Sequence, residues 1–292
     1  MKKKLISILL CTAMAVSVLA GCGGSTAETT EPEETTETAE STDEAEATDE
    51  AEATDEAEAS TEETEAAGTD KTYIIATDTT FAPFEFTDAD GNFVGIDMDI
   101  LAAVAEDQGF SYEIQSVGFD AALTALEAGQ ADGVIAGMSI TEERKNKFDF
   151  SSPYFDSGVV MAVVAGSDIT SYDDLAGKTV AIKSGTEGAS LAESIQEQYG
   201  FTTTVFDDSA TMYQDVVAGN SAACFEDYPV MGYAITQGLN LTMPTEKEQG
   251  SSYGFAVKKG ENAELLEMFE TGLNNIKENG KYQEILDKYI TE

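Results

Sequence analysis

The amino-acid sequence predicts an α/β fold made of two lobes, on the basis of three observations. From residue 71 onward, strand-like and helix-like segments alternate along the chain, which favours largely parallel sheets covered by helices. This part holds about 220 residues, enough for two hydrophobic cores. A single sheet built from all the expected strands would be very long, whereas two lobes joined by two extended crossing segments fit the length.

The first lobe is expected to begin with a short β-rich strand over 73–77. Residues 97–108 place apolar side chains at helical spacing, and Gly109 follows as a stop signal, which predicts a helix. Three further elements are expected in this half: a strand over 110–117, a helix over 120–128 and a strand over 132–136.

The alternation resumes after an apolar, strand-like run at 158–164. The expected strands of this half lie at 178–182, 202–206, 222–225 and 239–243, and the expected helices at 187–199, 209–218 and 227–237. A crossing segment at 253–257 and two helices at 262–279 and 281–289 then complete the chain. In such lobes, ligands bind beyond the carboxyl ends of the strands, where loops enter helix N-termini.

The chain opens with the features of an export signal. Three lysines precede an apolar run at 5–19, which is too short for a permanent membrane span and is typical of a secretory signal peptide. The run ends in Leu-Ala-Gly-Cys22, which resembles the lipobox of bacterial lipoproteins. That resemblance implies that residues 1–21 are removed and that Cys22 carries lipid. The alternative is an ordinary cleaved signal with a chance cysteine.

Residues 22–70 are expected to form the lipidated cysteine and a disordered acidic tether. Three tandem copies of TDEAEA run from Thr42 to Ala59, and residues 23–69 contain 18 acidic side chains with no Lys or Arg. Such a segment buries too little apolar surface to offset the entropy lost on ordering, and its like charges disfavour a helix.

Charge and cysteine content exclude several classes of function. The formal net charge is −41, and the chain has no histidine. This acidity argues against binding to nucleic acid or to anionic membrane surfaces. Behind Cys22 the only cysteine is Cys224, so no disulfide within the chain is expected. Cys224 lies in an apolar run and lacks a histidine base, so we expect a small buried hydrophobe and not a nucleophile.

Four loops at expected strand ends carry the polar residues of interest, at 78–84, 137–144, 183–186 and 225–229. The second loop contains Arg144, the only arginine of the chain. A planar guanidinium can donate two parallel, charge-assisted hydrogen bonds to a carboxylate, which lysine cannot do. Arg144 is therefore a candidate for binding a carboxylate ligand.

Six motifs in these loops and beside them occur in a characteristic order: FAPFEF, GIDMDI, GMSITEER, DFSSPY, IKSGT and FEDYP. Together they resemble the polar amino-acid solute-binding proteins of bacterial ABC importers (solute-binding family three), over residues 71–292. The resemblance implies a two-lobed periplasmic-binding-protein (Venus flytrap) fold of type II, with one amino acid in the cleft. Lobe 1 would comprise 71–157 and 254–292, and lobe 2 would comprise 158–253 with a crossover hinge strand at each end.

The resemblance also implies partners. The protein would deliver a polar L-amino acid to a membrane permease driven by a cytoplasmic ATPase. It would act as a monomer without cofactor, metal or nucleic acid, outside the cell membrane and attached only by its lipid anchor. Two alternatives are an extracytoplasmic dehydratase of the same fold and a receptor that senses an amino acid without transport. The lack of histidine, and an acceptor for an amino group at Asp227, argue against the dehydratase.

Nine positions match the ligand-binding positions of the family: Asp78, Phe81, Phe119, Gly137, Ser139, Arg144, Lys183, Thr186 and Asp227. The resemblance implies that Arg144 binds the α-carboxylate, beside the backbone of Gly137 and the hydroxyl of Ser139. It implies that the helix N-terminus at Thr186 also faces this carboxylate, and that Asp227 receives the α-ammonium group. The two phenylalanines would form walls that exclude water.

Two of these residues indicate glutamine as the ligand. Asp78 and Lys183 match positions that contact the side-chain amide in glutamine-binding members, and an acceptor with a donor would satisfy an amide. A glutamate side chain would meet Asp78, and a cationic side chain would meet Lys183. Glu187 and Glu226 depart from the glutamine-binding pattern and add negative charge, so a cationic or other polar amino acid is the alternative.

Several residues also have simpler interpretations. Ser139 and Ser184 each precede a glutamate by three residues and could cap helices. Arg144 could form a surface ion pair with Glu143 or Asp149, and the two phenylalanines could be core residues. Asp97 and Asp99 are expected at a helix start. Residues 88–92 begin like a calcium loop, but the glycine is misplaced, so a hairpin turn is expected instead.

Overall fold

The computed structural model describes residues 71–290. The expected signal peptide at 1–21, the lipidated Cys22 and the acidic tether over 22–70 lie outside the described residues. Within residues 71–290, no helix has the length and apolar character needed to cross a membrane.

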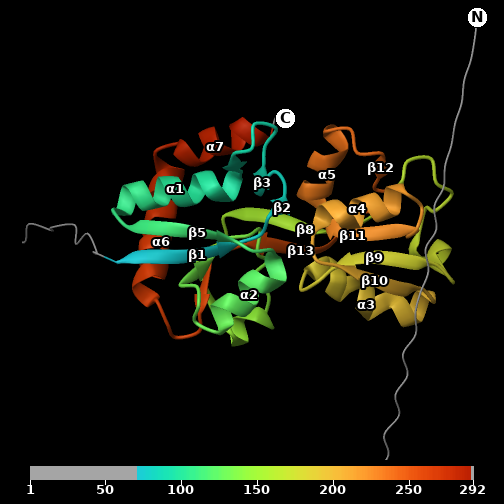
Figure 1. The fold of residues 1–292 in the computed structure, drawn as a ribbon, viewed down its shortest axis with the longest axis horizontal. Helices are drawn as coiled ribbons and strands as arrows, with labels where there is room; N and C mark the ends of the chain where they lie inside the picture. The colour runs from blue at the N-terminus through green and yellow to red at the C-terminus, as the bar shows by residue number, and fades with distance from the viewer. Residues whose placement is uncertain (1–70, 291–292) are drawn as a thin grey trace, which may run out of the picture. The chain divides into compact units, whose positions relative to one another are not determined.

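Lobe 1 is built on a five-stranded sheet with the order β5-β1-β6-β14-β7, of which Figure 1 labels β1 and β5. Its strands are β1 (Thr72–Thr77), β5 (Ser111–Ser116), β6 (Gly133–Val134), β7 (Phe148–Phe150) and β14 (Ala256–Lys258). The first strand pairs in parallel with β5 and β6, whereas β14 runs antiparallel to β6 and β7. The sheet of lobe 1 therefore contains a strand from near the end of the chain.

Helices cover both faces of this sheet: α1 (Ile96–Gln108), α2 (Phe119–Glu127), α6 (Ala263–Glu278) and α7 (Lys281–Tyr289). Consecutive side chains of a strand point to opposite faces. Accordingly, Ile75 packs in a cluster with residues of α1, α6 and α7, and Ala76 packs in a second cluster with residues of α2. Burial on both faces explains why the strands of such sheets are apolar.

Lobe 1 also contains a small three-stranded sheet, in the order β2-β3-β4. Its strands are β2 (Thr80–Phe81), β3 (Glu85–Thr87) and β4 (Phe93–Val94). The β3–β4 turn is closed by Asp88, whose Oδ1 accepts hydrogen bonds from the backbone N–H groups of Asp90 and Asn92. The hairpin interpretation of residues 88–92 is confirmed.

Lobe 2 contains the second sheet, in the order β10-β9-β11-β8-β12, with β13 paired to β8. Its strands are β8 (Phe155–Val164), β9 (Thr179–Lys183), β10 (Thr202–Phe206), β11 (Ala223–Asp227), β12 (Leu241–Thr242) and β13 (Glu248–Tyr253). Its helices are α3 (Glu187–Tyr199), α4 (Ser209–Val217) and α5 (Tyr228–Thr236). Val180 and Ile182 of β9 pack in one cluster and Ala181 in another, so this sheet is also covered on both faces.

Local sequence sets the limits of the helices. The hydroxyl oxygen of Thr186 accepts a hydrogen bond from the N–H of Ala189 and so caps α3, and Gly200 ends that helix with a left-handed backbone, φ 71°, as glycine readily does. Ser184 does not cap α3. Ser139 lies in an isolated β-bridge with Tyr253 and caps no helix. The capping interpretation of these two serines was wrong.

Two antiparallel strands carry the chain between the lobes. It enters lobe 2 along β8 and leaves along β13, and the two strands pair through Phe155 with Tyr253 and through Ser157 with Ser251 (Figure 1). The predicted crossing at 253–257 therefore spans the end of β13 and the start of β14. The remaining predicted strands and helices are all present, within three residues at each end.

Candidate binding site

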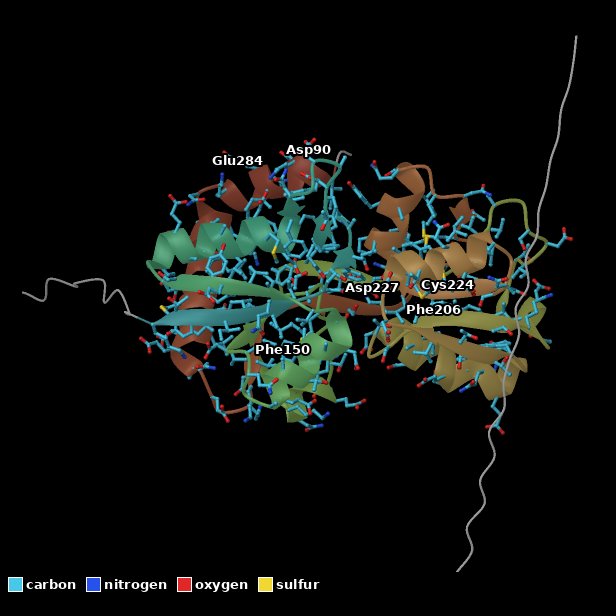
Figure 2. All side chains as sticks on the ribbon, viewed as in Figure 1. Asp90, Phe150, Phe206, Cys224, Asp227 and Glu284 are labelled. Carbon is cyan, nitrogen blue, oxygen red and sulfur yellow. The ribbon has the colours of Figure 1, made fainter. Side chains whose placement is uncertain are left out.

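All nine predicted site residues line one cavity between the two lobes. Ala136, Glu187 and Glu226 complete its lining. The cavity volume is about 20 Å³, which is room for roughly one water molecule. Figure 2 shows Asp227 in the centre of the described part of the molecule, where the lobes meet, and Cys224 further into lobe 2. Cys224 is buried and free, as expected.

The guanidinium group of Arg144 connects the two lobes. Arg144 begins the 3₁₀ helix η1 (Arg144–Asn146) of lobe 1 and is only 9% exposed, so it does not form a surface ion pair. Its Nη1 donates to the carbonyl of Ser139 at 2.8 Å, and its Nη2 donates to the carbonyl of Gly185 in lobe 2 at 2.9 Å. Glu187 is 3.5 Å away. A guanidinium has five N–H donors, and these two carbonyls account for two of them.

Asp227 ends β11 and precedes α5, and its carboxylate is 5% exposed. The hydroxyl of Tyr253, on the crossing strand β13, donates to Asp227 Oδ2 at 2.5 Å. Burial, reinforced by the charge of Glu226, raises the pKa of Asp227 to about 7, while Tyr253 and Arg144 oppose this rise. A cationic ligand group at this position would favour the ionised carboxylate.

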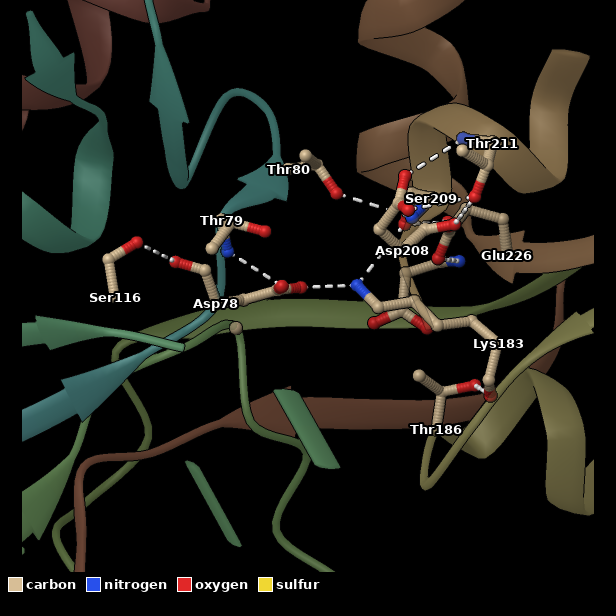
Figure 3. Close-up of polar contacts among 12 residues, drawn as sticks. Asp78, Thr79, Thr80, Ser116, Lys183, Thr186, Asp208, Ser209, Thr211 and Glu226 are labelled. Atoms are coloured by element: carbon tan, nitrogen blue, oxygen red, sulfur yellow. Dashed lines mark hydrogen bonds and ion pairs between the residues drawn. The ribbon is translucent and has the colours of Figure 1, made fainter. Parts of the chain in front are cut away.

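Asp78 and Lys183 form an ion pair across the cavity (Figure 3). Asp78 follows β1 of lobe 1, Lys183 ends β9 of lobe 2, and each side chain is 1% exposed. Burial lowers the pKa of Lys183, but Asp78 and Glu226 outweigh this effect, so the pKa is raised overall. Lys183 Nζ also donates to the hydroxyl of Ser209 at 3.2 Å. This end of the cavity thus offers one buried acceptor and one buried donor.

Glu226 is linked to Lys183 through the hydroxyl of Ser209 and is 2% exposed. Its Oε2 accepts hydrogen bonds from the hydroxyls of Ser209 at 2.9 Å and Tyr213 at 2.7 Å, and its Oε1 accepts from the backbone N–H of Asp227 at 2.9 Å. Three donors therefore already engage this carboxylate. From the sequence, Glu226 and Glu187 were expected to add negative charge near the cleft. Both line the cavity.

The aromatic walls each face a cation. The ring of Phe81 lies under Lys183 Nζ at 4.9 Å, and the ring of Phe119 lies under the guanidinium carbon of Arg144 at 5.3 Å. Both rings are 5% exposed. Gly137 adopts φ 52°, and a Cβ there would lie 2.4 Å from the ring of Phe81, so glycine permits the close approach of this backbone.

The sequence did not reveal two buried acidic residues close to the site, Asp97 and Glu85. Asp97 is in the first turn of α1, as predicted, but its side chain points inward and is fully buried. Its Oδ2 accepts from the N–H of Gly137 at 2.7 Å. Glu85 of β3 is also fully buried. Within residues 71–290, no group of three or more His, Cys, Asp or Glu side chains is arranged to hold a metal.

Comparisons with known proteins agree with this architecture. The chain is 30% identical over 226 residues to the arginine-binding extracellular protein ArtP of Bacillus subtilis, covering 76% of this chain and 87% of ArtP. It is 44% identical to substrate binding domain 2 of Lactococcus lactis GlnP in an open conformation, covering 77% and 98% of the two chains with a TM-score of 0.54. It is 36% identical to an ancestral arginine-binding protein bound to glutamine, covering 76% and 98% with a TM-score of 0.70.

The family model that matches is that of the bacterial extracellular solute-binding proteins, family 3, and it spans residues 73–292. The match includes both sheets, the two crossing strands and every residue that lines the cavity. This chain belongs to the bacterial extracellular solute-binding proteins of family 3.

Proposed function

We propose that this chain captures L-glutamine outside the cytoplasm and delivers it to the membrane permease of an ABC importer. The observation that carries the proposal is the arrangement of charges in the cavity. Arg144 and Asp227 are of opposite sign and come from different lobes. The Asp78–Lys183 pair supplies a second acceptor and donor in the same cavity.

The α-carboxylate and the α-ammonium group, which all amino acids share, match Arg144 and Asp227. Arg144 retains N–H donors beyond those used by Ser139 and Gly185, and these would bind an α-carboxylate. The N-terminus of α3 at Thr186 adds the backbone N–H groups of a first helical turn, which favour an anion. Asp227 would hold the α-ammonium, whose charge offsets the cost of ionising a buried carboxylate.

The Asp78–Lys183 pair favours an amide side chain. A carboxamide has a donor NH₂ and an acceptor oxygen, so it can insert between the pair and satisfy both residues. A glutamate side chain would bring a negative charge to Asp78, and an arginine or lysine side chain would bring a positive charge to Lys183. Either would leave a buried charge without compensation.

The two extra acids do not favour a cationic ligand. Glu226 already accepts three hydrogen bonds, from Ser209, Tyr213 and the Asp227 backbone. Glu187 Oε1 already lies 3.5 Å from Arg144. A cationic side chain would therefore have to displace existing partners, which costs free energy. This argument supports glutamine over the arginine named in some relatives.

Binding would be coupled to movement of the lobes. With a volume of about 20 Å³, the cavity must widen to admit an amino acid. The contacts that would separate include Asp78–Lys183, Arg144–Gly185, and the hydrogen bond from the backbone N–H of Ser209 to Thr80 Oγ1 at 3.2 Å. The ligand would favour closure through the contacts it gains only in the closed form.

The direct test is thermal unfolding of the purified protein with each L-amino acid, followed by calorimetry. Glutamine should raise the melting temperature most, because a ligand of the native state stabilises it by mass action. Arginine, histidine, cystine and glutamate are the informative competitors. If arginine binds more tightly than glutamine, the specificity proposal is wrong, and if no amino acid binds, the function itself is wrong.

The role proposed for Arg144 can be tested separately. Arg144→Ala should weaken glutamine binding by about 2–5 kcal/mol, because a buried carboxylate loses its partner. Arg144→Lys should recover only part of this loss, since lysine lacks the planar fork. Unchanged affinity in Arg144→Ala by calorimetry would contradict the assignment.

We further propose attachment of the protein to the outer face of the cell membrane through lipid on Cys22. Cys22→Ser should move the protein from the membrane fraction to the medium. Transport, as opposed to sensing, predicts that deletion of the chain abolishes uptake of labelled glutamine. Formation of product from prephenate-like cyclic acids would instead favour the dehydratase alternative.

A further inference from the structure

Two carboxyl groups are buried close to each other in lobe 1, where the backbone N–H of Asp97 donates to the carbonyl of Phe84, next to Glu85, at 2.9 Å. Glu85 of β3 and Asp97 of α1 are both fully buried. Asp97 Oδ2 accepts hydrogen bonds from the Gly137 N–H at 2.7 Å and from the Tyr154 hydroxyl at 2.8 Å. The other three oxygens, Glu85 Oε1, Glu85 Oε2 and Asp97 Oδ1, have no donor among the described residues. Buried oxygens without donors are costly.

One proton between the two carboxyl groups gives two of these three oxygens a partner. Burial raises the pKa of Glu85 well above its usual value, the charges of Asp97 and Asp78 add to the rise, and Lys183 opposes it. Burial raises the pKa of Asp97 to about 6, while hydrogen bonds from Gly137, from Tyr154 and from a protonated Glu85 oppose this rise. Lys183 is already paired with Asp78, so it does not neutralise Glu85.

The remaining ionisable groups around Asp97 are tyrosines. Tyr154 donates its hydroxyl to Asp97, and burial raises the pKa of Tyr154 well above its usual value. Burial also raises the pKa of Tyr282 to about 12, with Asp97 contributing. Both phenols stay neutral at physiological pH. Among the described residues of this cluster, proton exchange near neutral pH is therefore confined to the two carboxyl groups.

We propose that Glu85 and Asp97 share one proton and together act as a positioning pair for the binding site. The pair fixes the backbone N–H of Gly137. Two residues later, the carbonyl of Ser139 accepts from Arg144 Nη1, so the position of this short segment sets that of the guanidinium. The same Asp97 oxygen holds Tyr154, directly before β8. The role of the pair in positioning Arg144 rests on the proposed function, whereas the shared proton does not depend on that function.

The shared proton is tested without any amino acid. A raised pKa of Glu85 stabilises the fold below the usual value of 4.5, and this contribution is lost as the pH rises towards the folded-state pKa. Glu85→Gln supplies a permanent amide donor to Asp97 and removes this dependence. From about pH 5 up to the folded-state pKa of Glu85, the unfolding equilibrium constant of the parent should rise relative to Glu85→Gln by up to roughly tenfold per pH unit.

Infrared spectroscopy gives a direct second measurement. At neutral pH, the C=O band of protonated carboxylic acids should be stronger in the parent than in Glu85→Gln, and the partly protonated Asp227 contributes equally to both proteins. Glu267→Gln, at an exposed position on α6, is the matched control and should retain both the band and the pH slope. Equal pH slopes for the parent and Glu85→Gln, or a carboxylic acid band in Glu85→Gln equal to that of the parent, would overturn the shared proton.

The positioning role is tested by glutamine affinity. Asp97→Ala removes the acceptor of Gly137 and should weaken binding by about tenfold or more, as expected for loss of a hydrogen bond to a charged acceptor. Asp97→Asn keeps an acceptor oxygen and should bind within a few-fold of the parent, as should Glu85→Gln. If Asp97→Ala fails to fold, Glu85→Ala takes its place; it leaves Asp97 Oδ1 without a donor but keeps the bond from Gly137 to Asp97 Oδ2, so a smaller loss of affinity is expected.

The outcomes separate the two proposals. Parent-like affinity in a folded Asp97→Ala or Glu85→Ala variant overturns the positioning role. If the parent binds no amino acid, the proposed function fails, and the positioning role fails with it because no ligand depends on the segment. The shared proton is then still decided by the pH slope and the infrared band.

Discussion

Replacement of Lys183 by methionine is the sharpest test of the ion pair between the lobes. The substitution keeps the length of the side chain and removes its charge. Asp78 would be left 1% exposed, and among residues 71–290 its carboxylate would keep only the backbone N–H of Thr79 as a hydrogen-bond donor, at 2.6 Å. Removing one partner of a buried ion pair costs about 3–5 kcal/mol. We expect Lys183→Met to lower the free energy of unfolding by that amount.

The reciprocal substitution should cost less. In Asp78→Asn, Lys183 keeps the hydroxyl of Ser209 at 3.2 Å and the attraction of Glu226. The expected loss is about 1–3 kcal/mol. The structure therefore predicts an asymmetric pair, in which the acid depends on the base more than the base depends on the acid.

Urea unfolding at neutral pH without amino acid measures both effects. The double variant should lose less than the sum of the single losses, with a coupling energy of about 1–3 kcal/mol. Lys281→Met is the control, because its exposed pair with Glu284 should contribute less than about 1 kcal/mol. Additive losses to within about 0.5 kcal/mol would refute the pairing of Asp78 with Lys183 in solution.

Three further predictions concern the site. The pKa of Asp227 is about 7, so its ionised form is lost as the pH falls through 7. Glutamine affinity measured by calorimetry should then fall by up to about tenfold per pH unit, and a flat profile would contradict this. Tyr253→Phe removes the donor at 2.5 Å from Asp227, so it should raise that pKa, shift the affinity profile to higher pH and cost about 1–3 kcal/mol in urea unfolding. Gly137→Ala forces a left-handed residue, at about 1–2 kcal/mol, and a Cβ 2.4 Å from the Phe81 ring. It should weaken glutamine binding as well as lower the melting temperature, and an unchanged affinity would show that this backbone does not shape the site.

Most elements of the fold could be predicted from the sequence, because apolar residues recur at helical or strand spacing over their length. The limits of α3 (Glu187–Tyr199) and β10 (Thr202–Phe206) match the predicted ones residue for residue. The strands of the small β2-β3-β4 sheet were not predicted, because two or three residues show no periodicity. The start of β13 was also missed, because Glu248–Tyr253 is polar and lacks the pattern of a buried strand.

The helix caps show the limit of local rules. Ser184 precedes Glu187 by three residues and fits the capping pattern, yet Thr186 caps α3. The backbone at Thr186 is extended, with φ −90° and ψ 162°, which is the conformation of a cap residue. That conformation depends on where β9 ends and on how Lys183 is held, and neither is encoded within the four residues of the pattern.

The sequence alone determined which residue types were available for the site, and the family resemblance that the six motifs carry identified nine residues that line one cavity. The tertiary structure alone decided which charges are engaged. Glu226 and Glu187 appeared as surplus negative charge in the sequence, but partners from other elements satisfy them. Asp97 had the pattern of a helix-start residue, yet its carboxylate accepts a hydrogen bond from the backbone N–H of Gly137. The physical reason is that the free energy of a buried charge depends on donors and acceptors that are distant along the chain and meet only when the sheets, helices and crossing strands have packed.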